Sequence, residues 1–300
     1  MNKSVKSQEL NLRPKKSVFT ELYDAIKINP PAIFSLVVVI LYIIVGLFGE
    51  LMAPYEFDAM GAGTPLEKPG LKHFFGTDEF GRDVFSRILA GGRISLRIGV
   101  LVVGIAGIMG SLIGMISAYT GGWVDEAIMR VTDVFLSVPD LVMALVIATS
   151  LGAGIDAAII GITMVRWTGY ARLIRSGVIA EKGKDYVVAS TALGLHPNRI
   201  LFRHILPNSY TATLVQATFD FGLAILFASG LSFVGAGAQP PVPEWGALVA
   251  SGRQYVQAAW WIPIFPGFAI FGAVIAFNIL GDTLRDFLDP KLRHSMDQKN

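Results

Sequence analysis

Long apolar runs, separated by short polar connections, make up most of the chain. A helix needs about 20 mostly apolar residues to cross roughly 30 Å of hydrocarbon, and six stretches approach that pattern. They are Ala32–Met52, Ser95–Tyr119, Val131–Leu151, Asp156–Ala171, Tyr210–Val234 and Ile262–Asp282. The pattern therefore predicts an all-α membrane protein with six transmembrane helices.

Composition agrees with a membrane protein and excludes several other classes. Hydrophobic residues make up 53% of the 300 residues and charged residues only 16%, against roughly 25% charged in an ordinary soluble domain. The net charge of +2 is too small to indicate nucleic-acid binding. The chain has no cysteine, which excludes disulfides and thiolate metal sites.

The distribution of Lys and Arg predicts the orientation. Residues 1–30 hold six Lys/Arg against three acids and residues 172–209 hold six against two, whereas residues 53–93 hold five against six. The positive-inside rule then places the N-terminus and the 172–209 connection in the cytoplasm. An even number of spans returns the C-terminus to the same side. The connection Gly121–Asp140 should also be cytoplasmic but fits the positive-inside rule poorly, because it holds one basic residue, Arg130, and four acidic residues.

Glycine is frequent in the second predicted span. Gly110 and Gly114 have the spacing of small residues that lets two helices approach closely in lipid. Packing within the chain and contact with another subunit are both consistent with this pattern. The other glycines of the span are Gly99, Gly104 and Gly107.

Two ionisable residues lie deep in predicted spans. Arg166 is ten residues into the fourth span, and Asp220 lies thirteen residues beyond Pro207, so the two fall at similar depth. An intramembrane charge is a functional candidate by default. The two interpretations are a salt bridge between the fourth and fifth spans and a role in the substrate path.

The motifs of metal and nucleotide chemistry are missing. There is no HExxH, and the four histidines are scattered, which predicts no metal site. The phosphate-binding pattern GxxxxGK[ST] is also absent, so the chain does not bind ATP in that way. We expect no catalytic residue and no cofactor in this chain; if it pumps, another subunit supplies the energy.

The stretch before the fifth span is unusually polar. Lys184–Leu193 has a helix-forming composition, and Gly194 follows where a left-handed residue would end a helix. Pro197 suits the first turn of a second helix, which Pro207 would stop. Ile200, Leu201, Ile205 and Leu206 form one apolar side, opposite Arg199 and Arg203. Such a helix suits a groove on another protein or a layer of lipid headgroups.

The same stretch resembles the ATPase-docking loop of ABC importer permeases. Ala189, Gly194 and the pair Leu206-Pro207 match its pattern, whereas Val188, Ser190 and His204 depart from it. Val188 replaces the family's glutamate, for which Asp185 is the candidate substitute. The resemblance implies that docking uses Asp185, Ala189, Gly194, Pro197, Leu201, Leu206 and Pro207.

Three further segments are similar to the second permease subunit of dipeptide, oligopeptide and nickel importers. They are FFGTDEFGRDVFSRILAGGRISLRIG (Phe74–Gly99), GAQPPVPEWGALV (Gly237–Val249) and AFNILGDTLRDFLDPKL (Ala276–Leu292). The resemblance implies a type I ABC importer permease fold. It divides the chain into a cytoplasmic tail (1–31), a first helix with an external segment (32–93), a five-helix transport core (94–283) with the docking loop at 172–209, and a cytoplasmic tail (284–300).

The resemblance also implies partners and cargo. A second homologous permease, two cytoplasmic ATPases that hold ATP and magnesium, and an extracytoplasmic binding protein would assemble with this chain in the inner, cytoplasmic membrane. Short peptides are the expected cargo, with nickel or a metal chelate as the alternative. An ion-coupled secondary transporter that uses Arg166 and Asp220 is the alternative of another class; no inverted repeat supports it.

Overall fold

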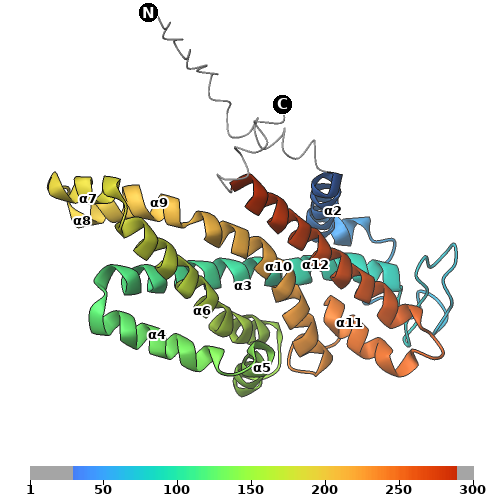
Figure 1. Ribbon diagram of the computed structural model, residues 1–300. Coiled ribbons are helices and arrows are strands. Elements are labelled where there is room, and N and C mark those ends of the chain that lie inside the picture. Colours follow the sequence, from blue (N-terminus) through green and yellow to red (C-terminus); the bar gives the residue numbers. More distant parts are fainter. Residues whose placement is uncertain (1–29, 289–300) are drawn as a thin grey trace, which may run out of the picture.

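Helices account for the regular elements of residues 30–288, the part of the chain that the computed structural model describes (Figure 1). The predicted tails therefore fall almost entirely outside the described residues. The long helices are α2 (Pro30–Met52), α3 (Val84–Thr120), α6 (Ile155–Lys182), α10 (Thr211–Phe233) and α12 (Trp261–Leu288). The shorter ones are α4 (Gly122–Leu136), α5 (Asp140–Leu151), α7 (Asp185–Ala192), α8 (Pro197–Ile200), α9 (Leu206–Ser209) and α11 (Trp245–Gly252).

Four of these helices are long and apolar enough to cross a membrane. They are α2, α3, α10 and α12, and α4 with α5 makes a fifth candidate if that bent pair is one span. The predicted fourth span lies in α6, which is not among the candidates and carries three arginines. The structure thus supports an all-helical protein with four or five candidate spans, and the prediction of six is not confirmed.

The predicted third span is not a straight helix. The sequence pattern joined Val131 to Leu151, but α4 ends at Leu136 and α5 begins at Asp140, with a bend of 90° between them. Pro139 lies at the break. Proline lacks an N–H and disfavours a helical conformation in the residue before it, so Pro139 favours a break in the helix at this point.

Two helices extend well past their predicted ends. α3 begins at Val84 rather than Ser95, because the Asp83 carboxylate caps it by accepting the Ser86 N–H at 2.8 Å. α6 continues to Lys182 rather than ending at Ala171. The proposed boundary at residue 93 therefore falls inside a helix. With 37 residues and a rise of about 1.5 Å per residue, α3 is longer than the hydrocarbon layer is thick.

The centre of the fold is the contact between α3 and α6. A Cβ atom on Gly110 would overlap the carbonyl oxygen of Trp167, and one on Gly114 would overlap that of Ala171. Both glycines are buried within the chain. Of the two interpretations of the glycine spacing, packing within the chain is therefore the correct one for Gly110 and Gly114.

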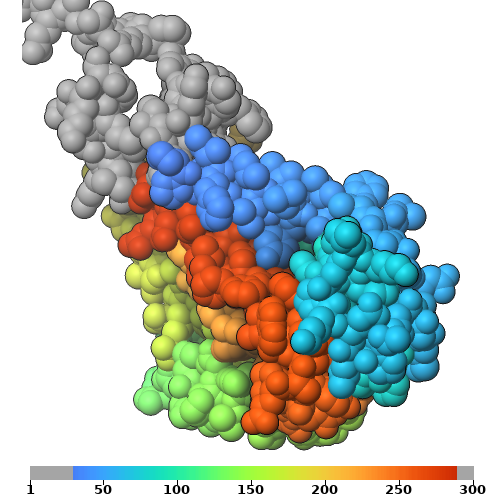
Figure 2. All heavy atoms as spheres, turned by 90° about the vertical axis from the view of Figure 1, so that its right-hand side faces the viewer, coloured from blue at the N-terminus to red at the C-terminus, as the bar shows by residue number. Residues whose placement is uncertain are grey.

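The connection between α2 and α3, residues 53–83, is tied to the helices around it. Asp78 accepts a hydrogen bond from Arg82 Nε at 2.7 Å and pairs with Arg87 of α3. The Trp261 indole N–H donates to the Thr77 carbonyl at 3.1 Å. Figure 2 shows this segment, light blue to cyan, beside α12 (orange to red) and α2 (blue). The connection between α2 and α3 is thus a folded unit.

We predict that Gly114→Ala destabilises the chain by about 1–3 kcal/mol, because the new methyl group overpacks the α3–α6 contact. Gly104→Ala is the matched control: it lies on the same helix, and nothing stands within 4 Å of its would-be Cβ. Thermal unfolding of the purified chain in detergent measures the difference. Equal melting temperatures for the two variants would contradict the assignment of Gly114 to a backbone contact.

Candidate functional site

The polar stretch between α6 and α10 folds as two short helical pieces that meet at Gly194. The N–H of Leu195 donates to the Ser190 carbonyl at 3.2 Å, and the N–H of Gly194 donates to the Thr191 carbonyl at 3.0 Å. This is a Schellman motif. Gly194 has φ +75°, which residues with a side chain rarely adopt. The predicted end of the first helix at Gly194 is confirmed.

The second piece begins at Pro197 as predicted, but it does not end at Pro207. His196 caps its start by accepting the Asn198 N–H on Nδ1 at 3.3 Å. A single π-helical turn, Leu201–Ile205, follows. Pro207 then lies in α9, which follows the π turn without a break. The prediction that Pro207 stops the helix is wrong.

The π turn and one amide side chain satisfy the backbone around Pro207. The Leu206 N–H donates to the Leu201 carbonyl, the longer spacing of a π turn. The Asn208 side-chain N–H donates to the His204 carbonyl at 2.7 Å. The chain therefore runs from the polar stretch toward α10 through short helical pieces, with one irregular step at Tyr210.

The apolar side of the second piece faces the chain's own core. Leu201 is 5% exposed, and it packs with Ile200 and Ile205 in a cluster that includes Ile174 and Val178 of α6. The interpretation of this side as open to a partner is therefore wrong for Leu201. Of the other predicted docking residues, Asp185, Ala189, Gly194, Pro197 and Pro207 are exposed, and Leu206 is half-buried.

Different apolar side chains are exposed on this stretch. Leu193 is 80% exposed, Val188 58% and Phe202 55%. Val188 is the residue that takes the place of the family's glutamate in the sequence comparison above. Phe202 lies within the π turn, one residue after the buried Leu201, and sequence reasoning did not single it out. We call Val188, Leu193 and Phe202 the exposed apolar set.

A buried carboxylate holds the polar stretch against the end of α6. Glu181 accepts hydrogen bonds from Lys184 Nζ and from the Tyr186 hydroxyl, and the Asn208 amide donates to that hydroxyl at 3.2 Å. Burial raises the pKa of the Glu181 carboxyl, but the bonds from Lys184 and Tyr186 outweigh it, so this pKa lies below its ordinary value. Sequence reasoning missed Glu181, whose only signal is the nearby lysine and tyrosine.

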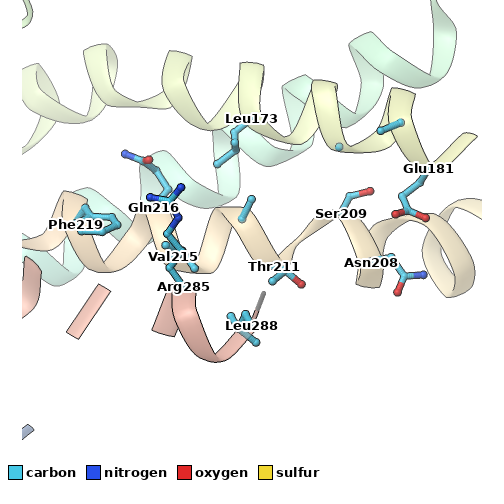
Figure 3. Close-up of a pocket in the computed structure, with 13 residues that line it drawn as sticks. Leu173, Glu181, Asn208, Ser209, Thr211, Val215, Gln216, Phe219, Arg285 and Leu288 are labelled. Carbon is cyan, nitrogen blue, oxygen red and sulfur yellow. The ribbon is translucent and has the colours of Figure 1, made fainter. Parts of the chain in front are cut away.

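A groove of about 570 Å³ opens where the polar stretch joins α6, α10 and α12 (Figure 3). Glu181 and Asn208 lie toward one end of it, and Gln216 and Arg285 lie toward the other. The rest of the lining is mostly small or apolar: Leu173, Gly177, Ala180, Ser209, Thr211, Ala212, Val215, Phe219 and Leu288. The polar stretch thus adjoins a cavity of the helical core.

Arg166 forms ion pairs with two aspartates. Its Nη2 pairs with Asp220 of α10, and its Nη1 lies 3.0 Å from Asp140 Oδ2 at the start of α5. Gln216 also donates to Asp220, at 2.9 Å. The Asp220 side chain is 3% exposed and that of Arg166 17%. The structure therefore contains the Arg166–Asp220 salt bridge, one of the two interpretations offered by the sequence. Together the two ion pairs of Arg166 join α5, α6 and α10.

Asp140 was not singled out from the sequence because the pattern placed it inside a continuous span. Its available signal is the preceding Pro139, since proline followed by an acidic residue is typical of a helix start. The structure brings Asp140 to Arg166 only because the chain turns by 90° at this point. The Arg166–Asp140 pair therefore depends on the break between α4 and α5.

Comparison with known proteins places the chain in a family. The family described as "Binding-protein-dependent transport system inner membrane component" matches residues 110–294, and the "N-terminal TM domain of oligopeptide transport permease C" matches residues 23–69. The first match covers more than half of the chain. The chain belongs to the family of binding-protein-dependent transport system inner membrane components, which confirms the resemblance seen in the sequence.

Curated relatives match along most of this chain. The dipeptide transport system permease protein DppC of Alkalihalophilus pseudofirmus is 41% identical over 92% of this chain and 91% of that protein. The probable D,D-dipeptide transport system permease protein DdpC of Escherichia coli is 41% identical over 93% and 95%. The di/tripeptide transport system permease protein DppC of Pseudomonas aeruginosa is 38% identical over 93% and 94%. The chain is similar to each across nearly its whole length.

We predict that Arg166→Met destabilises the chain by about 3–5 kcal/mol, because it leaves carboxylates in a poorly solvated site without their cation. Asp140→Asn should cost less, since Asp140 is more exposed and Arg166 keeps Asp220. Adding Asp220→Leu to Arg166→Met should recover part of the loss. Melting temperatures in detergent give the order. A double variant as damaged as the sum of its two single changes would contradict the pairing.

Proposed function

We propose that this chain is one of two permease subunits of an ATP-driven ABC importer for short peptides. A homologous permease forms the other half of the path, and an extracytoplasmic binding protein delivers the cargo. Family membership supports the permease role. The relatives named above are permeases for dipeptides, D,D-dipeptides or di/tripeptides, which supports peptide cargo. The chain itself makes or breaks no covalent bond in this proposal.

The exposed apolar set is the main observation that supports an ATPase-docking role for this segment. Val188, Leu193 and Phe202 present apolar surface on a segment that Glu181 and the π turn hold in a fixed shape. An exposed apolar patch on a folded protein commonly marks a protein interface. We infer that two cytoplasmic ATPases bind ATP with magnesium and dock on this segment and on its counterpart in the second permease.

The helical pieces after Pro197 give docking a route into the transport core. The exposed apolar set lies at one end of this route, and α10, with Asp220, lies at the other. Approach of the two ATPases moves the docking segments together and tilts α10 and α6. Because Arg166 ties α6 and α10 to α5, the three helices move as one unit. Hydrolysis then resets the complex.

In the membrane, we propose that this segment and both termini face the cytoplasm. The Lys/Arg surplus of residues 1–30 and 172–209 supports this orientation. Residues 53–83, which we call the external segment, and α11 then lie on the side of the membrane where the binding protein delivers cargo. The same orientation puts the exposed apolar set on the side where ATP is available.

Peptide uptake tests the proposal directly. We predict that proteoliposomes containing the complete complex, with the ATPases facing the lumen, accumulate a labelled dipeptide. Uptake should require both the binding protein outside the vesicles and ATP inside them. An imposed proton or sodium gradient without ATP should give no uptake. Gradient-driven uptake without ATP would instead support the ion-coupled alternative, and ATP-dependent uptake of nickel but not of peptide would support the metal alternative.

We predict that Phe202→Asp lowers ATPase co-purification at least about tenfold while leaving the melting temperature of the chain unchanged, because a charge then enters an apolar groove unpaired. Val234→Asp is the matched control, because Val234 is a similarly exposed apolar residue at the C-terminal end of α10, away from the docking segment. Leu201→Lys should instead lower the melting temperature, since Leu201 is buried within the chain.

Gly194→Val should also reduce co-purification, because a β-branched residue at positive φ costs about 1–3 kcal/mol and reshapes the bend. Normal retention of ATPase by both Phe202→Asp and Gly194→Val would show that the segment does not dock an ATPase.

A further inference from the structure

An exposed apolar stripe runs along α12 and reaches the external segment. Ile264, Phe268 and Phe271 are exposed at helical spacing on this candidate span, and Trp260 is 50% exposed directly before its first residue. Such a stripe on a helix of membrane-spanning length faces lipid or another subunit. Trp260 stands where the stripe leaves the span.

Aromatic contacts link Trp260, at the end of the stripe, to residues 74–75 through half-buried rings. The ring of Trp260 lies 5.8 Å from that of Phe265, which stacks on Phe75 of the external segment at 4.0 Å. Phe75 and Phe74 both meet Phe85 of α3 edge-on, at 5.0 and 5.7 Å. These ring contacts form one unbroken series from α12 to Phe74. Figure 2 shows the two regions side by side on one face of the molecule.

The series ends at side chains that the chain does not cover. Leu71 is 95% exposed and Phe74 56%. Lys68 and Lys72 are exposed next to them in sequence, and neither forms an ion pair with any residue that the structure describes. We call Leu71, Phe74 and Trp260, with the two lysines at their edge, the aromatic patch.

The backbone beneath the patch is held in place. His73 lies between Leu71 and Phe74, and its Nδ1 lies 2.9 Å from Asp83 Oδ1 in a buried pair. The Tyr55 hydroxyl donates to the Lys72 carbonyl at 3.3 Å. These contacts fix the segment with Leu71 and Phe74 pointing outward, so the chain cannot bury them by folding over.

We propose that the aromatic patch inserts into the headgroup region of the membrane and anchors residues 53–83 to the lipid surface. Aromatic rings at the end of a span are typical of the lipid–water interface. Lysines beside them can keep their ammonium groups in water and near lipid phosphates. The continuity with the exposed stripe of the α12 span favours lipid over a soluble protein as the occupant.

In this proposal the patch gives the external segment a mechanical role, in addition to the chain's role in forming the translocation path. Because Trp261 and Phe75 tie the segment to α12, and Phe85 ties it to α3, insertion at Leu71 and Phe74 sets the depth of both helices. The segment is an interfacial anchor in this proposal, and it leaves α11 to face the binding protein.

Depth-dependent fluorescence quenching tests the anchor; this chain has no native cysteine, so a single introduced cysteine is its only label once partner subunits are made cysteine-free. Leu71→Cys and Phe74→Cys carry a small environment-sensitive dye in the full complex, in nanodiscs of neutral and anionic phospholipid. Glu56→Cys is the control, since it is exposed on the same segment but lies outside the patch. We expect lipid brominated near its headgroup to quench the dye at 71 and 74 at least about twofold more than at 56, and more than lipid brominated near its tail end.

Equal quenching at all three positions would overturn the proposal. So would a dye at 71 or 74 that stays as accessible to a water-soluble quencher as the dye at 56. If binding protein alone then shielded positions 71 and 74, the patch would be a protein-docking surface. None of these outcomes bears on peptide uptake, so the anchor and the transport function fail independently.

Discussion

The close contact between the backbones of α3 and α6 positions every candidate site on this chain. Hydrophobic burial adds little to helix association in lipid, so helices associate there through tight packing, which small residues allow. At Gly110 and Gly114 the two helices meet without a side chain between them. α6 carries Arg166 in its middle and Glu181 at its end, so its seat on α3 fixes both the ion pairs and the docking segment.

The sequence predicts best where one local signal decides the structure. α2 and α10 lie within two residues of their predictions, since apolar runs leave the backbone no other way to satisfy its hydrogen bonds in a membrane; α12 begins as predicted but ends six residues later. The bend of the docking segment was also predictable. Glycine adopts positive φ at little cost, as at Gly194, and proline is suited to a helix start, as at Pro197. The residue type alone therefore predicts the local conformation at both positions.

Features that depend on distant partners could not be predicted. The predicted fourth span ends at Ala171, but Arg175 pairs with Asp125 of α4 and the helix continues on polar contacts. The sequence assigned Leu201 to a partner's groove or to a layer of lipid headgroups, and only the position of α6 shows that it packs in the chain's own core. Asp140 reaches Arg166 because of the 90° bend, which hydropathy does not register.

The π turn at Leu201–Ile205 has a consequence for how the docking segment is aimed. A π turn is equivalent to one residue inserted into an α-helix, and one residue corresponds to a rotation of about 100° around the helix axis. The turn therefore sets the rotational phase between α8, which precedes it, and α9, which follows it. In subunits of this kind, a length change of one residue here would turn the docking face away from its ATPase without altering any residue that touches it.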